Sequence, residues 1–167
     1  MKMDANHFVR SIARHTRSWR DAAVESLREA GCTDLSYRPT SGMSAFGWLL
    51  AHQAAVFDYT LNILIKEESP KRPDLFSLYT PGTEGNWAGT PLQDIEEYYD
   101  SSEQDLVDWT EQADDEELER VLQGEDIPKF FQGMRVIDVI ANAFVHLNHH
   151  NGHLSAIKGD WSSPSEK

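Results

Sequence analysis

The sequence predicts an all-α protein: a four-helix bundle with a long loop between its second and third helices. Three observations favour this class. Apolar residues recur at spacings of three and four along long segments, as in helices that bury one face. Glycine and proline gather between those segments. The chain shows no internal repeat, no Walker loop, GxGxxG motif or GxSxG elbow, and no ExxH pairs of the kind found in di-iron bundles.

The first predicted helix runs from residue 6 to about residue 30, and Gly31 supplies its C-terminal stop. Two histidines fall on it. His7 lies near the start of the helix, and His15 has no acidic or histidine neighbour one turn away. We interpret both as solvated or packing residues and not as ligands. The apolar face consists of Phe8, Ile12, Trp19, Ala23 and Leu27.

The second predicted helix runs from about residue 45 to residue 67, after a loop at residues 35–42 and with Ser44 as its N-cap. This segment is apolar on most sides, so we expect a central helix buried by neighbours on more than one face. His52 is the one histidine on its inward stripe. A lone histidine there is often a hydrogen-bonded core residue, and the alternative is a ligand.

A long connection follows from residue 69 to residue 90, where proline, glycine, serine and threonine replace the helical pattern. Its aromatic and aliphatic residues are too numerous for a disordered linker. We therefore expect it to fold across the bundle and to roof a pocket. The apolar residues concerned are Phe76, Leu78, Tyr79 and Trp87.

The third predicted helix has Thr90 as its N-cap and Pro91 at its first position, and it runs to about residue 113. The acidic run at residues 114–119 lacks the spaced Asp, Asn and Gly of a calcium loop, which favours a solvated face.

The last connection, residues 124–133, contains Lys129-Phe130-Phe131 as a brief extended or turn segment. The fourth helix spans about residues 134 to 158 and ends at Gly159. Residues 161–167 form a short polar tail. Together these elements predict one helical domain over residues 1–160.

Composition limits the classes of function. A net charge of -13 and a pI near 4.8 argue against sequence-independent binding of nucleic acid or of an anionic membrane, because both need basic patches. The N-terminal residues have no apolar signal region, and no stretch of 18 uninterrupted apolar residues occurs, so we expect a cytoplasmic location. Cys32 has no second cysteine to pair with, and we assign it no role.

The segment HLNHHNGH, residues 146–153, holds four of the seven histidines. On a helix, His146 and His150 lie about 40° apart in azimuth and one turn from each other. Such a pair can hold one divalent cation, although the Glu of a protease HExxH motif is absent. The alternative is a pair of polar, half-buried core residues. The apolar stripe around them favours a metal site, because burying imidazoles without partners is costly.

Three features together resemble the DinB/YfiT-like four-helix bundle family: WLLAHQAAVFDYTLNIL, HLNHHNGHLSAIKG, and one histidine in the second helix with a spaced pair in the fourth. The resemblance covers nearly the whole chain. It implies that one divalent metal ion is bound by His52, His146 and His150. The run Asn151-Gly152-His153-Leu154 replaces the family's usual Arg-Gly-Gln-aliphatic run, and we interpret Gly152 as allowing close helix approach.

His153 stands where the family has Gln, as a fourth ligand, a partner of a ligand, or a proton carrier; it is our candidate catalytic residue. His149 lies on the other flank, as a surface or interface residue. Three imidazoles leave coordination positions open, which is typical of catalytic sites. Zn, Ni, Cu and Fe all suit such a site, with Zn, Ni or Fe expected.

The resemblance implies a thiol S-transferase that uses a low-molecular-weight thiol and a small-molecule substrate, and a homodimer. The alternative is a non-catalytic metal- or small-ligand-binding bundle, or a dimerising interaction protein. Five cations in or beside loops are candidates to hold an anionic thiol. They are Arg38, Lys71, Arg72, Lys129 and Arg135.

Overall fold

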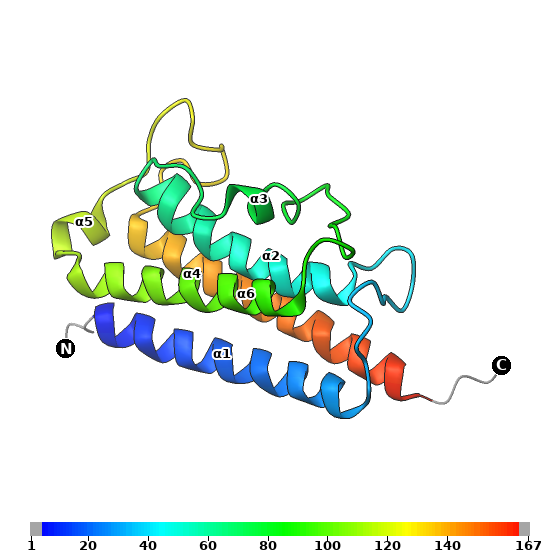
Figure 1. Ribbon diagram of the computed structural model, residues 1–167. Helices are drawn as coiled ribbons and strands as arrows, with labels where there is room; N and C mark the ends of the chain where they lie inside the picture. The colour runs from blue at the N-terminus through cyan, green and yellow to red at the C-terminus, as the bar shows by residue number, and fades with distance from the viewer. Residues whose placement is uncertain (1–4, 164–167) are drawn as a thin grey trace.

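The computed structural model describes residues 5 to 163, and within them it is helical, with one isolated β-bridge between Val121 and Arg135. Four long helical segments lie side by side (Figure 1). They are α1 (Ala5–Glu29), α2 (Phe46–Asp58) with its continuation η1 (Tyr59–Ile65), α4 (Leu92–Gln112) and α6 (Val136–Ser162). Two short helices, α3 (Pro73–Phe76) and α5 (Asp115–Glu119), lie in the connections. The predicted all-α bundle is therefore confirmed.

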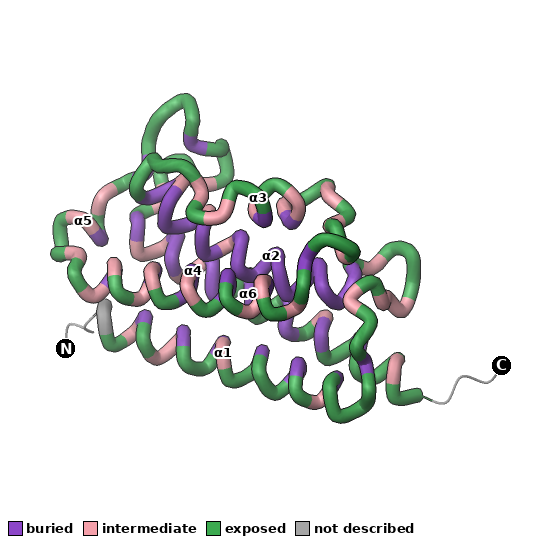
Figure 2. The backbone as a smooth tube through the Cα atoms, viewed as in Figure 1, coloured by how far each residue is buried: buried purple, intermediate pink, exposed green. Residues whose placement is uncertain are grey.

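Helix α2 is the centre of the bundle. It packs mainly on α4 and also on α6, while α1 packs mainly on α6. All residues of α2 except Val56 are buried, and Figure 2 shows this helix as the most continuously buried one. The other long helices bury one face only, as amphipathic helices do. On α1, however, Trp19 is 67% exposed, so its predicted place on the apolar face was wrong.

The second helical segment changes its hydrogen bonding halfway. After Asp58 the chain continues as a seven-residue π-helix, in which the backbone N–H of Lys66 still bonds five residues back to Leu61. The sequence predicts one α-helix over residues 45–67, so this change in helix type was not anticipated. Glu67, with φ of 57°, ends the segment in the left-handed region.

Two predicted N-caps are wrong by one residue. Ala45, not Ser44, precedes α2, and no side chain caps it. The first N–H groups of α2 are instead satisfied by loop carbonyls, since Phe46 donates to Tyr37 and Gly47 donates to Leu35. The lack of a side chain on Gly47 allows this approach, because an added Cβ would meet Leu35 and Trp87 within 3.0 Å.

The second misplaced cap is at α4. Pro91 takes the cap position with extended backbone, and its carbonyl accepts from Asp94. Thr90, the predicted cap, is buried and makes no capping bond. The acidic run after α4 forms α5, where the Asp114 side chain accepts from the backbone N–H of Glu117. Its acids stay mostly exposed, as expected for a solvated face.

Of the two helix ends predicted at glycines, one is confirmed and the other is wrong. At the end of α1, Gly31 has φ of 78°, and bonds from Gly31 to Arg28 and from Cys32 to Leu27 complete a Schellman motif, as predicted. Helix α6, in contrast, continues past Gly159 to Ser162. Its last turn is held to the rest of the protein because the Trp161 indole donates to the carbonyl of Ala30 at 2.9 Å.

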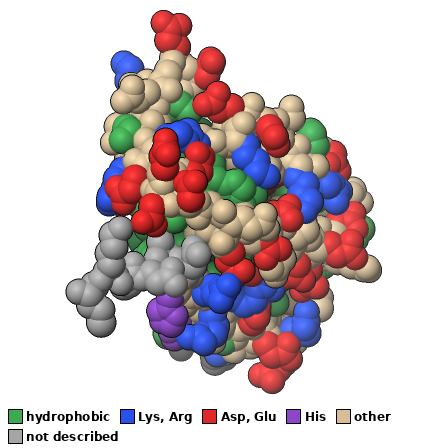
Figure 3. Space-filling view, turned by 90° about the vertical axis from the view of Figure 1, so that its left-hand side faces the viewer, with side chains coloured by type: hydrophobic (Ala, Val, Ile, Leu, Met, Phe, Trp, Pro, Cys, Tyr) green, Lys and Arg blue, Asp and Glu red, His purple; other side chains and the backbone are tan. Residues whose placement is uncertain are grey.

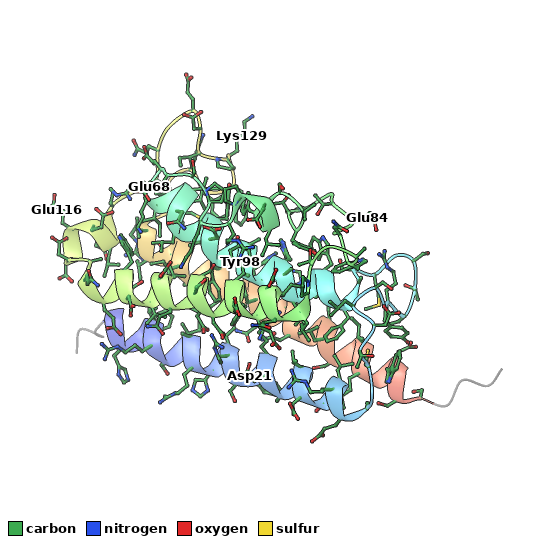
Figure 4. All side chains as sticks on the ribbon, viewed as in Figure 1. Asp21, Glu68, Glu84, Tyr98, Glu116 and Lys129 are labelled. Atoms are coloured by element: carbon green, nitrogen blue, oxygen red, sulfur yellow. The ribbon has the colours of Figure 1, made fainter. Side chains whose placement is uncertain are left out.

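A buried carboxylate fixes the long connection to the central helix. Asp58 is 1% exposed and accepts from Tyr98 Oη at 2.6 Å and Asn62 Nδ2 at 2.6 Å. It also accepts from the backbone N–H groups of Lys71 and Arg72 at 2.9 and 3.3 Å. Tyr98 points from α4 into the bundle (Figure 4). Burial and the Asp58 contact raise the Tyr98 pKa well above its ordinary value.

No helix in residues 5–163 has both the length and the apolar character needed to cross a membrane. On the end of the bundle seen in Figure 3, acidic and basic side chains are interspersed.

Candidate metal centre

Three histidine side chains converge between α2 and α6; His52 and His150 are buried, and His146 is only partly buried. His52 comes from α2, and His146 and His150 come from successive turns of α6. The Nε2 atom of His146 lies 3.2 Å from Nε2 of His52 and 2.9 Å from Nε2 of His150. One nitrogen from each ring lies within 4.8 Å of the others. The structure thus brings together the three residues that the sequence predicts as ligands.

Hydrogen bonds do not account for this cluster. A neutral ring nitrogen carries either one hydrogen or one lone pair, so Nε2 of His146 can share a proton with only one of its two neighbours. A cation that receives a lone pair from all three rings satisfies them together. In a tetrahedral zinc site with Zn–N bonds of about 2.0–2.1 Å, ligand nitrogens lie about 3.3 Å apart. The separations of 2.9 and 3.2 Å are close to that value.

The ring of His52 is held in one orientation. Its Nδ1 lies 2.8 Å from the carbonyl oxygen of Tyr79, and a carbonyl only accepts, so Nδ1 carries the proton. That tautomer leaves the Nε2 lone pair free for a cation. The indole ring of Trp48 stacks on the His52 ring, with centroids 4.3 Å apart and planes 19° apart. Neither contact was predicted from the sequence.

A network of polar side chains lies beside the three histidines and links their helices. Gln53, next to His52, donates to Asn151 Oδ1 at 3.0 Å, and Asn151 donates to the backbone carbonyl of Thr16 at 3.1 Å. These bonds join α2, α6 and α1 beside the histidines. Nδ1 of His150 is buried and has no hydrogen-bond partner in the described part of the chain. Sequence reasoning noted Asn151 only as a departure from the family pattern and missed this role.

Burial keeps the cluster uncharged. Burial is the main cause, and together with the neighbouring histidines it lowers the pKa of His52 to about 4 and that of His150 to about 2. The His146 pKa is also lowered by burial. All three rings are therefore neutral near pH 7, which is the form that binds metal.

We expect the metal-free protein to lose stability as the pH falls below about 6.5, the ordinary pKa of histidine. Below that pH the unfolded chain protonates His52, whereas the folded state binds that proton only near pH 4. His52 alone then costs about 3 kcal/mol of unfolding free energy by pH 4. Urea denaturation at pH 7 and pH 4 measures this loss. His52→Gln should reduce the loss and the exposed His15→Gln should not; equal losses in both variants would contradict the assignment.

The other two histidines of the fourth helix lie on the outer flank of the cluster. The rings of His149 and His153 contact each other, with centroids 4.4 Å apart, and His153 lies 5.6 Å from His150. Neither belongs to the three-residue cluster. Gly152 does not serve close helix approach, because an added Cβ would meet nothing within 4 Å. That interpretation of Gly152 was wrong, since the residue faces outward.

A cavity of about 350 Å³ opens onto His52 and His146. Its walls come from α2, η1, α6, the long connection and the loop before α6. The expectation that the long connection roofs a pocket is confirmed, because Phe76, Thr80 and Pro81 line this cavity. The other lining residues are Ala55, Val56, Tyr59, Thr60, Phe130, Phe131, Asn142 and Ala143.

None of the five loop cations lines this cavity. Figure 4 shows Lys129 on the outer loop, pointing away from the bundle. The other four form ion pairs with carboxylates: Arg38 with Glu84, Lys71 with Asp105, Arg72 with Asp74, and Arg135 with Glu119 and Asp138.

The fold and the site define a helical-bundle protein with a three-histidine centre able to hold a metal ion at the mouth of a cavity. The family model of the DinB superfamily matches residues 12–154, and the chain belongs to this superfamily. No curated protein matches the chain.

Proposed function

We propose that this protein is a divalent-metal-dependent enzyme that transfers a low-molecular-weight thiol to a small electrophilic substrate. The observation that carries the proposal is the convergence of three neutral imidazole nitrogens beside a cavity large enough for a small molecule. Structural metal sites are usually closed by four protein ligands, whereas three protein ligands leave a position for substrate.

Each part of the centre has a defined task in this proposal. His52, His146 and His150 supply the three donors, and the Tyr79 carbonyl keeps His52 in the tautomer with a free Nε2. When bound, a divalent ion supplies Lewis acidity, which lowers the pKa of a thiol or water. The cavity walls exclude water and position the electrophile.

The overall reaction is a substitution at carbon. The thiol loses its proton to solvent, sulfur forms a bond to the electrophilic carbon, and the leaving group departs with the electrons of the broken bond. His153 does not line the cavity, so its geometry gives no support for a role as the proton carrier. Zn, Ni or Fe remains the proposed metal, because all suit imidazole donors.

The test uses protein purified without a histidine tag. Elemental analysis should find about one equivalent of divalent metal, as three donors at one point predict. The metal-loaded protein should then consume a thiol from a panel of low-molecular-weight thiols in the presence of 1-chloro-2,4-dinitrobenzene, and chelation should stop the reaction. Metal retention without turnover of any thiol would overturn the enzyme proposal and favour a non-catalytic metal-binding bundle. Absence of metal would overturn both.

A further inference from the structure

The cavity beside the histidine centre is mostly apolar, and its described walls carry no Lys, Arg, Asp or Glu. It is lined mainly by aromatic and aliphatic side chains. We infer that the molecule bound there, the electrophile of the proposed reaction, is an uncharged compound with a planar apolar body and one polar end. The chemical class of the ligand follows from the cavity alone, whereas its role as the electrophile rests on the proposed function.

Aromatic rings from three segments, Tyr59, Phe76 and Phe131, form one wall of the cavity. The rings of Tyr59 and Phe76 are nearly parallel, with planes 18° apart and centroids 6.3 Å apart. The ring of Phe131 is tilted by 54° against that of Tyr59, at 6.1 Å between centroids. Flat aromatic surfaces bind planar apolar groups well, because offset and edge contacts add to the burial of area. These rings favour an aromatic or conjugated ligand.

The π-helix contributes to this wall. Tyr59 and Thr60 are its first residues and both line the cavity. π-helical turns are often found at functional sites. Phe130 is 68% exposed although it lines the cavity, so it lies at the rim with an apolar surface still open to solvent. A ligand reaching the rim would cover it.

Polar groups are few, and one lies on the histidine side. Asn142 and His146 are four residues apart on α6, so they share one face of the helix. The Asn142 amide has no hydrogen-bond partner among the described residues, which leaves its donors and acceptor for a ligand. A hydroxyl, carbonyl or nitro group on the ligand would satisfy it. The polar end of the ligand therefore lies toward His146 and the apolar body toward the aromatic wall.

Charge argues against an anionic ligand in this cavity. The chain carries a net charge of -13, so its overall field repels anions. In the metal-free protein, and at the aromatic wall away from the histidines, an anion would lose its hydration without gaining a cationic partner, because no Lys or Arg lines the cavity. An uncharged ligand incurs neither cost.

The experiment compares two fluorescent probes that share one ring system. N-phenyl-1-naphthylamine is uncharged, and 8-anilinonaphthalene-1-sulfonate carries a sulfonate. Both are titrated into the metal-free protein. The uncharged probe should bind at least roughly tenfold more tightly, because the sulfonate must be desolvated without a partner. Equal or tighter binding of the sulfonate would overturn the inference.

Three variants test whether the probes bind in this cavity. Phe131→Ala should weaken binding of the uncharged probe by roughly tenfold through loss of an aromatic contact. Val145→Ala, which removes an exposed apolar side chain outside the cavity lining, should leave it unchanged. Asn142→Lys should narrow the difference between the probes by supplying a cation. If Phe131→Ala and Val145→Ala bind the uncharged probe equally, the inference fails. Helical circular dichroism confirms that each variant is folded.

The result is independent of the test of the proposed function. Metal retention and thiol consumption are measured on metal-loaded protein, and probe binding on metal-free protein. If the two probes bind equally while the protein still retains metal and consumes a thiol, the inferred ligand class is wrong and the proposed function stands. If the protein prefers the uncharged probe but retains no metal, the proposed function is wrong and the inferred ligand class is supported.

Discussion

Replacing His150 with alanine is expected to lower the affinity for a divalent ion by at least about 100-fold, because mutating even the outer partners of metal ligands typically costs 10–100-fold. His150 supplies one of three donors, and its Nε2 lies 2.9 Å from that of His146. Isothermal titration of metal-free protein with Zn²⁺ and Ni²⁺ measures the effect. A second measurement is thermal: an ion at 100 times its Kd stabilises the wild-type protein by about 2.7 kcal/mol, and the variant should lack this increase.

The matched control is His149→Ala. His149 is the adjacent residue on the same helix, is exposed, and stands outside the three-residue cluster. Its removal should change metal affinity little, since it supplies no donor to the shared point. If both alanine variants retain the wild-type affinity, the three imidazoles do not hold the ion.

Asp58→Ala is expected to lower the free energy of unfolding by about 3–5 kcal/mol, the range for breaking a buried, hydrogen-bonded charged group. The substitution leaves the Tyr98 hydroxyl, the Asn62 amide and two backbone N–H groups without their acceptor. Guanidinium denaturation followed by circular dichroism at pH 7 measures the loss. The connection after η1 should also become more accessible to proteases, because Asp58 fixes its start.

Asp108→Ala is the control for this prediction. Asp108 is an exposed acid of α4 that accepts a hydrogen bond from the Gln104 side chain, so its removal should change stability by at most about 0.5 kcal/mol. Asp58→Asn should fall between the two, because it keeps one acceptor oxygen but places an amide donor among donors. Equal stability of the two alanine variants would show that the buried carboxylate does not anchor the connection.

The positions of the four long helical segments were predictable because apolar residues at helical spacing mark the face that a helix buries. The same signal places His52 inward and places His146 and His150 on one stripe. Local cap rules did less well. Ser44 and Thr90 have the right side chains, but loop carbonyls and the extended backbone of Pro91 determine where α2 and α4 begin.

The remaining parts of the site depend on contacts between segments distant in sequence. The acceptor that orients His52 is a backbone carbonyl, which every residue has, so no side chain pattern marks Tyr79 for this role. The cavity is built from five segments, and its uncharged character follows from which loop residues turn inward. The π-helix that begins at Tyr59 likewise has no marker in the apolar periodicity, which predicted one continuous α-helix over residues 45–67.

The segment Tyr79–Pro81 has two contacts at once: the Tyr79 carbonyl accepts from His52, and Thr80 and Pro81 form cavity wall. A compound that shifts this wall also shifts the acceptor on which the His52 tautomer depends. We therefore expect occupancy of the cavity and affinity for the ion to be coupled through this backbone segment. By thermodynamic reciprocity, whatever factor the ion applies to binding of the compound, the compound applies to binding of the ion.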